Sequence, residues 1–453
     1  MRSDGRTIMK LETGSLPLLY KALEQLETAF AELPDCDVEA NMEALQSTLL
    51  AAADRMHDNY PYFHPLYAGQ MLKPPHPIAR LAYMLSLWLN PNNHALDGGR
   101  ASSAMEKEAV AEIAMMFGWQ AHLGHLCGGG TMANLEALWV SGCLKPDKII
   151  AASTQAHYTH ERISNVLKLP FQAVPCDRRA RMDLNALEAE LKRGKIGTVV
   201  ATIGTTATGS VDPLPDLLTL QERYGFRIHA DAAYGGYYIL ASNLDSETRK
   251  AFDCLSRVDS IAIDPHKHGL QPYGCGCILF KDPAVGKLYK HDSPYTYFSS
   301  TELHLGEISL ECSRAGASAV ALWATQRLMP LVPGGQFAAG LEKSRQAALS
   351  LFGKLESDAR FRTAFRPELD IIIWAPRADS ASRTSRLSRE VFASAAKRGL
   401  HLALATLPIE LLGKSWPDMK WDQNRVTCLR SCLMKPEHLD WLERIWQILA
   451  QTV

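Results

Sequence analysis

Short apolar runs alternate with longer amphipathic stretches over residues 104–280, and this alternation is the feature that most restricts what the chain can fold into. Stretches with helical periodicity lie at 104–117, 131–142, 158–168, 183–193, 213–224 and 246–256. Strand-like runs lie near 148–152, 171–175, 198–203, 226–230, 259–263 and 275–280. Because strands that alternate with helices form mainly parallel sheets with helices on both faces, we predict an α/β fold. Ligands of such sheets bind outside the carboxyl ends of the strands.

The sequence on either side of this region predicts two further parts. Residues 15–58 have helical periodicity broken at Pro34, which predicts an N-terminal helical arm, 1–60, ahead of a large domain, 61–330. After the Pro- and Gly-rich stretch that begins at Pro330, we predict a small C-terminal α+β domain, 331–453. The additional predicted helices are 78–89, 314–329, 336–357, 384–398 and 436–450, and the additional strands are 369–375 and 424–430.

Composition and charge argue against several classes of protein. A net charge of −1 gives no support for nucleic-acid binding. The N-terminus is too polar for a secretory signal, and no apolar stretch approaches the roughly 20 residues of a membrane span. Ten cysteines spread over the chain are typical of reduced thiols, so we expect a cytoplasmic protein. Cys275 and Cys277 have the spacing of a redox or metal pair, but the alternation in CGCILF favours a packed strand.

Two charged side chains follow neighbouring strand-like runs at the predicted ligand edge. Lys267 lies in DPHKHG, after the run at 259–263, and Asp231 lies in HADAAYGG, after the run at 226–230. An amine and a carboxylate at adjacent strand ends are what pyridoxal 5'-phosphate (PLP) requires. The amine forms a Schiff base, and the carboxylate keeps the pyridine nitrogen protonated so that the ring takes up electrons. We therefore predict a PLP site around these two residues.

Other strand ends carry groups suited to the same cofactor. The glycines of CGGGT, 127–131, open a predicted helix, where free N–H groups and the helix dipole bind a phosphate. His157 can stack on one face of a pyridine ring while Ala233 packs on the other, although a lone histidine here is more often a cap or core residue. A hydroxyl of Thr205-Thr206 can bond the cofactor, although such a pair usually forms a turn.

Eight segments occur in the order typical of one enzyme family. They are HPLYAGQM (64–71), SSAMEKEAV (102–110), GGGTMANLEAL (128–138), TQAHYTHERI (154–163), ATIGTTATGSVDP (201–213), HADAAYGG (229–236), DPHKHG (264–269) and LRSCLMKPEH (429–438). Together they make the chain resemble the group II PLP-dependent amino acid decarboxylases, which have the aspartate-aminotransferase-like type I fold. The stretches DPHKHGLQPYGCG and SRAGASAVALWA are most similar to the bacterial tyrosine decarboxylase and archaeal tyrosine/aspartate decarboxylase branch.

The resemblance implies roles for matching residues. Lys267 matches the lysine that binds the cofactor, Asp231 the partner of the pyridine nitrogen, and His157 the stacking histidine. Tyr273 matches a catalytic tyrosine of the tyrosine decarboxylase branch, and Arg430 matches an arginine near the substrate carboxylate. The other expected cofactor contacts are Gly129, Gly130, Thr131, Thr206, Ala233, Asp264 and His266, and the other expected substrate contacts are Tyr67 and Gln70.

The implied activity is decarboxylation of an L-amino acid to the amine and carbon dioxide, through an external aldimine and a quinonoid. An aromatic, tyrosine-like substrate is favoured, since Phe63 and Tyr67 can form an aromatic wall. An acidic substrate, glutamate or aspartate, is the alternative. Polar side chains that could bind its second carboxylate are Gln70, His94, Arg100 and His268.

The family also implies a homodimer with shared active sites. We expect Tyr295, Tyr297, Ser299 and Ser300 to reach the partner's cofactor. Position 268 is histidine, where a bulky apolar residue is common in the family, and the segment between Lys267 and the helix at 314 is short. The candidate proton donor is Tyr273, Lys267 itself or one of the two loop tyrosines.

Functions of other classes fit the sequence less well. A metal hydrolase could use His122 with His125, His157 with His160, or the histidines around Lys267, but no HExxH run and no third ligand at a recognisable spacing occur. We therefore predict no metal. A catalytically silent relative is disfavoured because the lysine, aspartate and stacking histidine are intact. Another PLP-dependent carbon–carbon lyase or an aminotransferase of the same fold stays open as an alternative.

Overall fold

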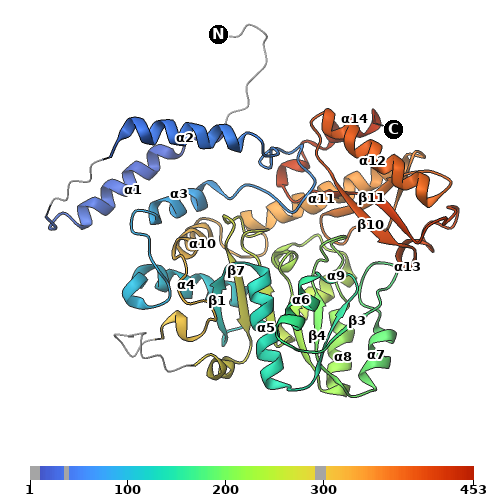
Figure 1. The fold of residues 1–453 in the computed structure, drawn as a ribbon, viewed down its shortest axis with the longest axis horizontal. Helices are drawn as coiled ribbons and strands as arrows, with labels where there is room; N and C mark the ends of the chain where they lie inside the picture. Colours follow the sequence, from blue (N-terminus) through green and yellow to red (C-terminus); the bar gives the residue numbers. More distant parts are fainter. Residues whose placement is uncertain (1–10, 35–39, 291–302, 453) are drawn as a thin grey trace, which may run out of the picture.

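The computed structural model describes residues 11–34, 40–290 and 303–452. Its centre is a seven-stranded sheet in the order β1-β7-β6-β5-β4-β2-β3 (Figure 1). Strands β2 to β6 pair in parallel, while β7 is antiparallel to both of its neighbours. The predicted α/β fold with a mainly parallel sheet is confirmed. The strands are β1 (Leu123–Cys127), β2 (Ile149–Ser153), β3 (Phe171–Val174), β4 (Ile196–Thr202), β5 (Arg227–Asp231), β6 (Ser260–Ile263) and β7 (Gly276–Phe280).

Helices pack around this sheet. Every residue of β4 and β6 is buried, as expected for strands that are covered on both faces. Their sequences, IGTVVAT and SIAI, are therefore continuous rather than alternating apolar runs. In the described ranges, no helix is long and apolar enough to cross a lipid bilayer. The helices of this part are α4 (Leu96–Met116), α5 (Gly130–Leu144), α6 (Thr159–Val166), α7 (Leu184–Leu191), α8 (Leu214–Tyr224), α9 (Ser246–Asp253) and α10 (Ala317–Leu328).

Strand β1 is the one member of the large sheet that the sequence pattern does not predict. Its sequence, LGHLC, has no β-branched residue, and it is held at the sheet edge by antiparallel pairing along β7. On the facing strand, Cys277 is fully buried, as is Cys275 just before it. The interpretation of CGCILF as a packed strand is confirmed.

A second, antiparallel sheet of four strands in the order β10-β11-β9-β8 forms the C-terminal part. Strands β8 (Phe361–Thr363) and β10 (Ala403–Pro408) are additions to the predicted elements, at the two edges of this sheet; the predicted strands are β9 (Ile371–Pro376) and β11 (Arg425–Cys432). Helices α11 (Gln336–Ser357) and α12 (Ala381–Lys397) are present as predicted, and a short α13 (Ile409–Leu412) follows β10. The helix predicted at 436–450 is instead a 3₁₀ turn, Pro436–His438, followed by α14 (Leu442–Ala450).

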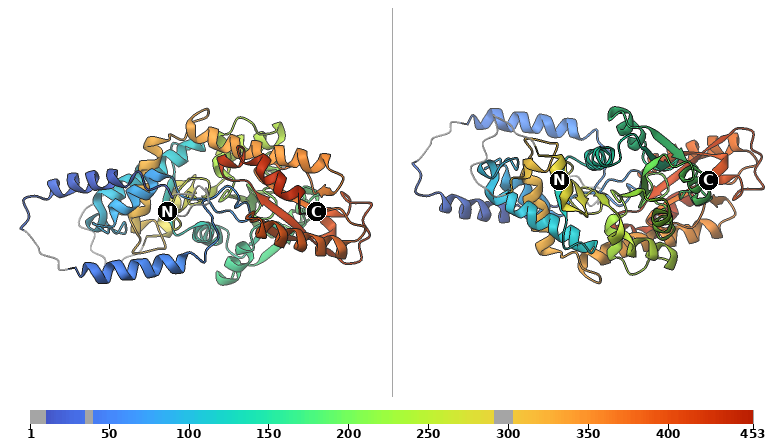
Figure 2. Two further views of the ribbon diagram at one scale, coloured as in Figure 1. Left: turned by 90° about the horizontal axis from the view of Figure 1, so that it is seen from above. Right: turned by 90° about the horizontal axis from the view of Figure 1, so that it is seen from below.

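The N-terminal helices α1 (Leu16–Ala29) and α2 (Met42–Met56) extend beyond one end of the molecule (Figures 1 and 2). Helix α1 packs on α3 (Pro77–Ser86), with Leu19 as its one buried residue, whereas α2 has no buried residue. Contacts cross the predicted domain boundaries, because the N–H of Ala68 donates to the carbonyl of His401, 2.8 Å away beside the second sheet. The boundaries at 60 and 330 stay a prediction.

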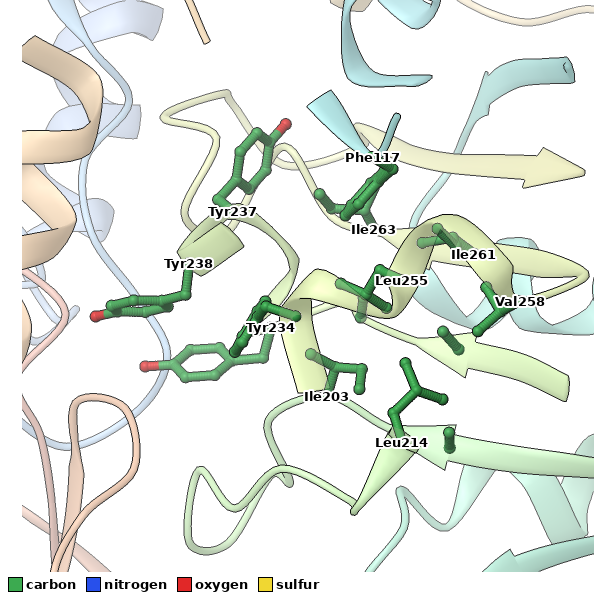
Figure 3. Packing of buried hydrophobic residues seen from close by; sticks show 14 of the residues in the cluster. Phe117, Ile203, Leu214, Tyr234, Tyr237, Tyr238, Leu255, Val258, Ile261 and Ile263 are labelled. Atoms are coloured by element: carbon green, nitrogen blue, oxygen red, sulfur yellow. The ribbon is translucent and has the colours of Figure 1, made fainter. Parts of the chain in front are cut away.

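A large apolar cluster beside the sheet fixes the strands that carry the predicted site. Phe117, Leu255 and Ile261 lie in this cluster, and each is at most 1% exposed (Figure 3). Tyr234 lies at its margin, just after β5. The end of β5 is therefore held by close packing, which limits how far its side chains can move.

Candidate cofactor site

A cavity of about 510 Å³ opens where β4, β5 and β6 end and α5 begins. The structure brings together in its wall all eleven residues that we expect around the cofactor, from six separate segments of the chain. These are Gly129, Gly130, Thr131, His157, Thr206, Asp231, Ala233, Asp264, His266, Lys267 and Tyr273. Their convergence follows from the parallel sheet, since the carboxyl ends of parallel strands meet at one edge.

Asp231, the last residue of β5, is held in a buried hydrogen-bonded pair. Its Oδ2 lies 2.8 Å from Nε2 of His160, a fully buried residue in the first turn of α6, and its Oδ1 accepts the N–H of Ala233 at 3.2 Å. Burial raises the pKa of this carboxyl, but the hydrogen bond and charge of His160 and the charge of Lys267 more than offset it, so the pKa lies well below its usual range. These contacts favour the anionic form of Asp231, which lines the cavity.

Two contributors to this part of the site are missed by the sequence analysis. His160 was noted there only as a possible metal ligand, and the structure turns it to Asp231 instead. Thr202, which pairs with Asp231 in the register of β4 and β5, also lines the cavity, and its buried hydroxyl has no hydrogen-bond partner in the part of the chain that the structure describes. The i, i+3 spacing of His157 and His160 was the available signal, because His157 lies just before α6 and His160 lies in its first turn. The described residues contain no group of three or more His, Cys, Asp or Glu side chains arranged to hold a metal ion.

Lys267 lies in a tight turn directly after β6. Its Nζ is 2.9 Å from Oδ2 of Asp264, and its N–H donates to the carbonyl of the same residue at 2.9 Å. Asp264 is 2% exposed, and its Oδ1 has no hydrogen-bond partner among the described residues. The amine is thus positioned at the cavity by an anchored carboxylate, while about a fifth of the lysine side chain remains exposed to solvent (21%).

The turn between β1 and α5 forms a cradle for an anion. Gly129 has a φ of 149°, a conformation that other residues rarely adopt, and it directly precedes the first turn of α5. A Cβ on Gly130 would lie 2.8 Å from Oδ2 of Asp264, so this position also requires glycine. Because no side chain caps the helix, the first N–H groups of α5 and its dipole are available to a phosphate.

His157 and Thr206 also line the cavity, and each lies four residues after the end of a strand, β2 and β4 respectively. The ring of His157 is stacked on that of Tyr158, with centroids 4.4 Å apart, and its Nδ1 accepts the N–H of Thr159 at 3.2 Å. Burial lowers the pKa of His157, which favours a neutral ring. Of the threonine pair, Thr205 is fully buried and bonded to Thr208 in a turn, so Thr206 is the exposed member.

Tyr273 and His266 flank the lysine turn. Their rings are 4.7 Å apart, and Nδ1 of His266 lies 2.8 Å from the carbonyl oxygen of Cys275. The hydroxyl of Tyr273 donates to the carbonyl of Met71 at 3.3 Å, and the side chain is 56% exposed. It is therefore accessible to a substrate. Tyr295 and Tyr297, the other candidate proton donors, lie outside the described residues.

A second cavity of about 760 Å³ adjoins the first and shares His157 and Thr206 with it. Arg430 and Gln70 line it. The guanidinium of Arg430 donates to the carbonyls of Gly69 and Ala207 at 3.0 and 3.2 Å, and its buried Nη2 has no hydrogen-bond partner in the described ranges. An arginine with a free N–H in a cavity of this size can bind a carboxylate.

Three residues considered as substrate contacts lie elsewhere. Tyr67 is 4% exposed, with its ring 4.9 Å from that of Tyr62, and Phe63 lines a separate cavity. Neither belongs to the walls of the two cavities described above, so they form no aromatic wall there. His268 is buried with its Nε2 3.3 Å from Oδ2 of Asp370 and also lies outside these walls. The spacing of the strands could not predict where these three side chains point, because loop side chains are oriented by packing between the two sheets.

The site combines an amine, a carboxylate and a glycine cradle at the ends of parallel strands, an arrangement that fits PLP. The pyridoxal-dependent decarboxylase conserved domain matches residues 132–375, more than half of the sequence, and the chain belongs to this family. The residues fit the cofactor on structural grounds: Lys267 supplies an amine, Asp231 is a buried anion, and the glycine cradle is a space that a Cβ at Gly130 would fill.

The chain is similar in sequence to proteins that are named as decarboxylases. The chain is 29% identical over 364 residues to an L-tyrosine decarboxylase of Enterococcus faecium, a match that covers 58% of this chain and 60% of that protein. It is 28% identical over 346 residues to an aspartate 1-decarboxylase of Aliivibrio fischeri, covering 65% of this chain and 61% of the relative. The matches thus span about three fifths of these two relatives. The structure of Oryza sativa TDC with PLP and tryptamine has the same fold, with a TM-score of 0.77 at 17% identity over 98% of this chain and 99% of that one.

Proposed function

We propose that this protein decarboxylates an L-amino acid to the corresponding amine with PLP as cofactor. The observation that carries the proposal is the pair of charged groups at neighbouring strand ends: the amine of Lys267, fixed by Asp264, and the anion of Asp231, fixed by His160. When bound, PLP supplies the electron sink that stabilises negative charge on the substrate Cα. The protein supplies binding, orientation and proton transfer.

Each residue has a separate task in this proposal. Asp231 holds a proton at the cofactor ring nitrogen, because its anionic form is maintained by His160 at 2.8 Å. Lys267 anchors the cofactor through its Nζ. His157 restricts the tilt of the ring from one face, and the cradle at Gly129 and Gly130 fixes the phosphate end through backbone N–H groups.

With PLP bound, the substrate carboxylate would have to be held in one fixed orientation for carbon dioxide to leave. Arg430 supports this orientation, since its Nη2 is buried in the adjoining cavity with no partner among the described residues. Positioning of this kind lowers a barrier by roughly 7–11 kcal/mol in favourable cases. The hydroxyl of Tyr273, exposed beside the lysine turn, is the proposed proton donor to Cα after carbon dioxide has left.

An aromatic L-amino acid such as tyrosine is the first candidate substrate. The adjoining cavity is large enough for its ring, and apolar side chains provide part of the wall. These are Pro175, Leu404, Leu407 and Pro408. The tyrosine decarboxylase relative supports the same class.

An acidic L-amino acid is the second candidate, and a specific observation favours it. Arg425 lines the adjoining cavity in addition to Arg430, and Glu410 is the acidic residue among the described residues of its wall. A side-chain carboxylate would be attracted by the second arginine. The aspartate 1-decarboxylase relative is consistent with this alternative.

We further propose that the protein is a homodimer in which the arm contacts a second copy. The apolar residues of α2 that are more than half exposed include Met42, Leu45, Leu49 and Met56, and no residue of this helix is buried. An exposed apolar helix face of this length needs a covering partner. The family resemblance, in which sites are built at a subunit boundary, makes a second copy the proposed partner.

The proposal is tested by incubating the purified protein and PLP with each L-amino acid and measuring both amine and carbon dioxide. Equimolar release from at least one amino acid supports decarboxylation, and loss of both products in Lys267→Ala assigns it to this site. Tyramine production would support the aromatic class, whereas turnover of aspartate or glutamate alone would replace it by the acidic class. Keto-acid formation without carbon dioxide would contradict the decarboxylase proposal.

A further inference from the structure

A third cavity, of about 420 Å³, lies between the segment before α3 and the start of α11. It shares no lining residue with the cofactor cavity or with the cavity that adjoins it. His268, the residue directly after Lys267, contributes to its wall. The third cavity is therefore separate from the other two, although one of its wall residues is the sequence neighbour of Lys267. The proposed reaction does not use this cavity.

Among the described residues, three lysines and one acid line the cavity. Lys73, Lys343 and Lys435 are in its wall, and Glu437 is the one carboxylate there. Lys435 is 2% exposed, and no carboxylate lies within 4 Å of it or of Lys73 in the described part of the chain. Lys73 is partly buried, and the carboxylates that act on these lysines, Glu437 on both and Asp370 on Lys73, form no ion pair with them in the described part of the chain. Burying an ammonium group without a close counter-ion is costly, so this arrangement favours an anion in the cavity.

The two inner lysines use only part of their hydrogen-bonding capacity. Nζ of Lys435 donates to the carbonyl of Tyr67 at 2.7 Å, and Nζ of Lys73 reaches the carbonyl of Met434 at 3.5 Å. Each ammonium has three N–H donors, so both retain donors for a ligand. Burial lowers the pKa of Lys435 to about 8, since the nearby acidic groups Cys432 and Glu437 offset only part of the effects of burial and of the charge of Lys73.

A buried imidazole gives an independent indication of a ligand. His268 is 1% exposed, and its Nδ1 has no hydrogen-bond partner among the described residues. Its Nε2 faces Asp370, whose other oxygen accepts the hydroxyl of Tyr234 at 2.6 Å. Figure 3 shows the hydroxyls of Tyr234 and Tyr238 turned to the same side, away from the apolar cluster. The carboxylate of Asp370 is thus already paired with His268 and Tyr234.

The rest of the wall is mainly apolar, with His76 and Gln336 as further polar residues. It consists mainly of Phe63, Pro74, Pro75, Pro77, Leu270, Met329, Phe337 and Leu341. Pockets of a few hundred Å³ with an apolar lining and a few convergent polar groups are typical of sites for small organic ligands. We propose that this cavity binds a small organic carboxylate, with its charged group at Lys73 and Lys435 and its apolar body against the phenyl and leucine side chains. The proposal does not depend on the proposed reaction.

Titration calorimetry of the PLP-loaded protein with benzoate tests the site, because benzoate has the charge and the apolar body. Acetate and benzyl alcohol each supply one of the two parts and should bind at least about tenfold more weakly. Lys435→Met and Lys73→Met should each weaken benzoate binding about tenfold or more, since each removes a charge-assisted hydrogen bond. Lys397→Met, at an exposed lysine of α12, should leave it unchanged.

Arg430→Met separates this cavity from the proposed substrate site. Benzoate affinity should be unaffected in this variant if the carboxylate binds at the lysines, and reduced if it binds at the arginine. Circular dichroism melting identifies a variant that fails to fold. If Lys435→Met does not fold, the proposal is tested with Lys73→Met. The proposal is overturned if benzoate shows no saturable binding, if both folded lysine variants bind it as the wild type does, or if Arg430→Met abolishes binding.

Discussion

At the scale of single residues, the ionisation of Asp231 is the property on which the proposed chemistry depends. A fully buried carboxyl would ordinarily become protonated, and a neutral acid would not hold a proton on the cofactor ring. The hydrogen bond from Nε2 of His160, at 2.8 Å, reverses this tendency. His160 is therefore a positioning residue that acts through Asp231.

Replacing His160 tests this dependence. His160→Ala should lower kcat by about 10- to 100-fold, because a hydrogen bond to a charged group contributes about 1.5–3 kcal/mol. His160→Gln, which keeps an N–H donor, should recover part of the loss. The visible absorption spectrum of the bound cofactor should change in the alanine variant and return towards that of the wild type in the glutamine variant. An unchanged spectrum together with wild-type kcat in His160→Ala would show that Asp231 needs no such partner.

Tyr273 provides a second prediction at this scale. Its side chain is exposed at the lysine turn, and within the described ranges its hydroxyl has one hydrogen bond, to the carbonyl of Met71 at 3.3 Å, so it can move to a substrate. Tyr273→Phe should slow amine formation by about 10²–10⁴-fold, the usual contribution of a general acid. Part of the turnover should then appear as aldehyde, measured by chromatography of the products. Amine formation at the wild-type rate would assign the proton to another donor.

At the scale of secondary-structure elements, the turn from β1 into α5 determines how the phosphate end of the cofactor is held. Gly129→Ala should weaken PLP binding by about tenfold or more, because a side chain at a φ of 149° costs roughly 1–2 kcal/mol or displaces the turn. Titration of the apo-protein with PLP, followed by fluorescence, measures this. Gly353→Ala is the matched control, since a Cβ there meets nothing within 4 Å in α11. Equal PLP affinity in the two variants would contradict the assignment of the cradle.

The elements of the large sheet were predictable to different extents. β4 and β6 were predictable because full burial on both faces requires continuous apolar sequences. β1 was not, since LGHLC is held by its pairing with β7 rather than by intrinsic strand preference. The edge strands β8 and β10 were also missed, because their sequences give weak strand signals. β8 has only three residues, and β10 ends in proline.

The same distinction applies to the site. Residues at strand ends, such as Lys267 and Asp231, could be placed because the topology of a parallel sheet brings strand ends together. The partner of Asp231 lies on a helix, and a sequence does not show towards which strand His160 is turned. The orientation of Tyr67 was equally beyond prediction, because it depends on contacts between the N-terminal segment and the second sheet around His401.

At the scale of the whole molecule, the exposed apolar arm predicts how the protein associates. Leu45→Glu should shift the protein from dimer to monomer, because burying one leucine contributes about 1.5–3 kcal/mol and the introduced charge would have to be buried. Ser47→Glu, at an exposed polar position of the same helix, should leave the dimer intact. Sedimentation velocity distinguishes the two variants. A wild-type protein that is monomeric at micromolar concentration and fully active would contradict the proposed dimer.

The account as a whole depends on one covalent attachment. Borohydride reduction of the PLP-loaded protein, followed by peptide mass spectrometry, measures directly where the cofactor is bound. The expected result is a pyridoxyl group on Lys267 alone, with Lys267→Ala carrying none, because this amine is the one anchored in the cavity by Asp264 at 2.9 Å. A pyridoxyl group on a different lysine, or unchanged labelling of Lys267→Ala, would contradict the site on which the proposed function is built.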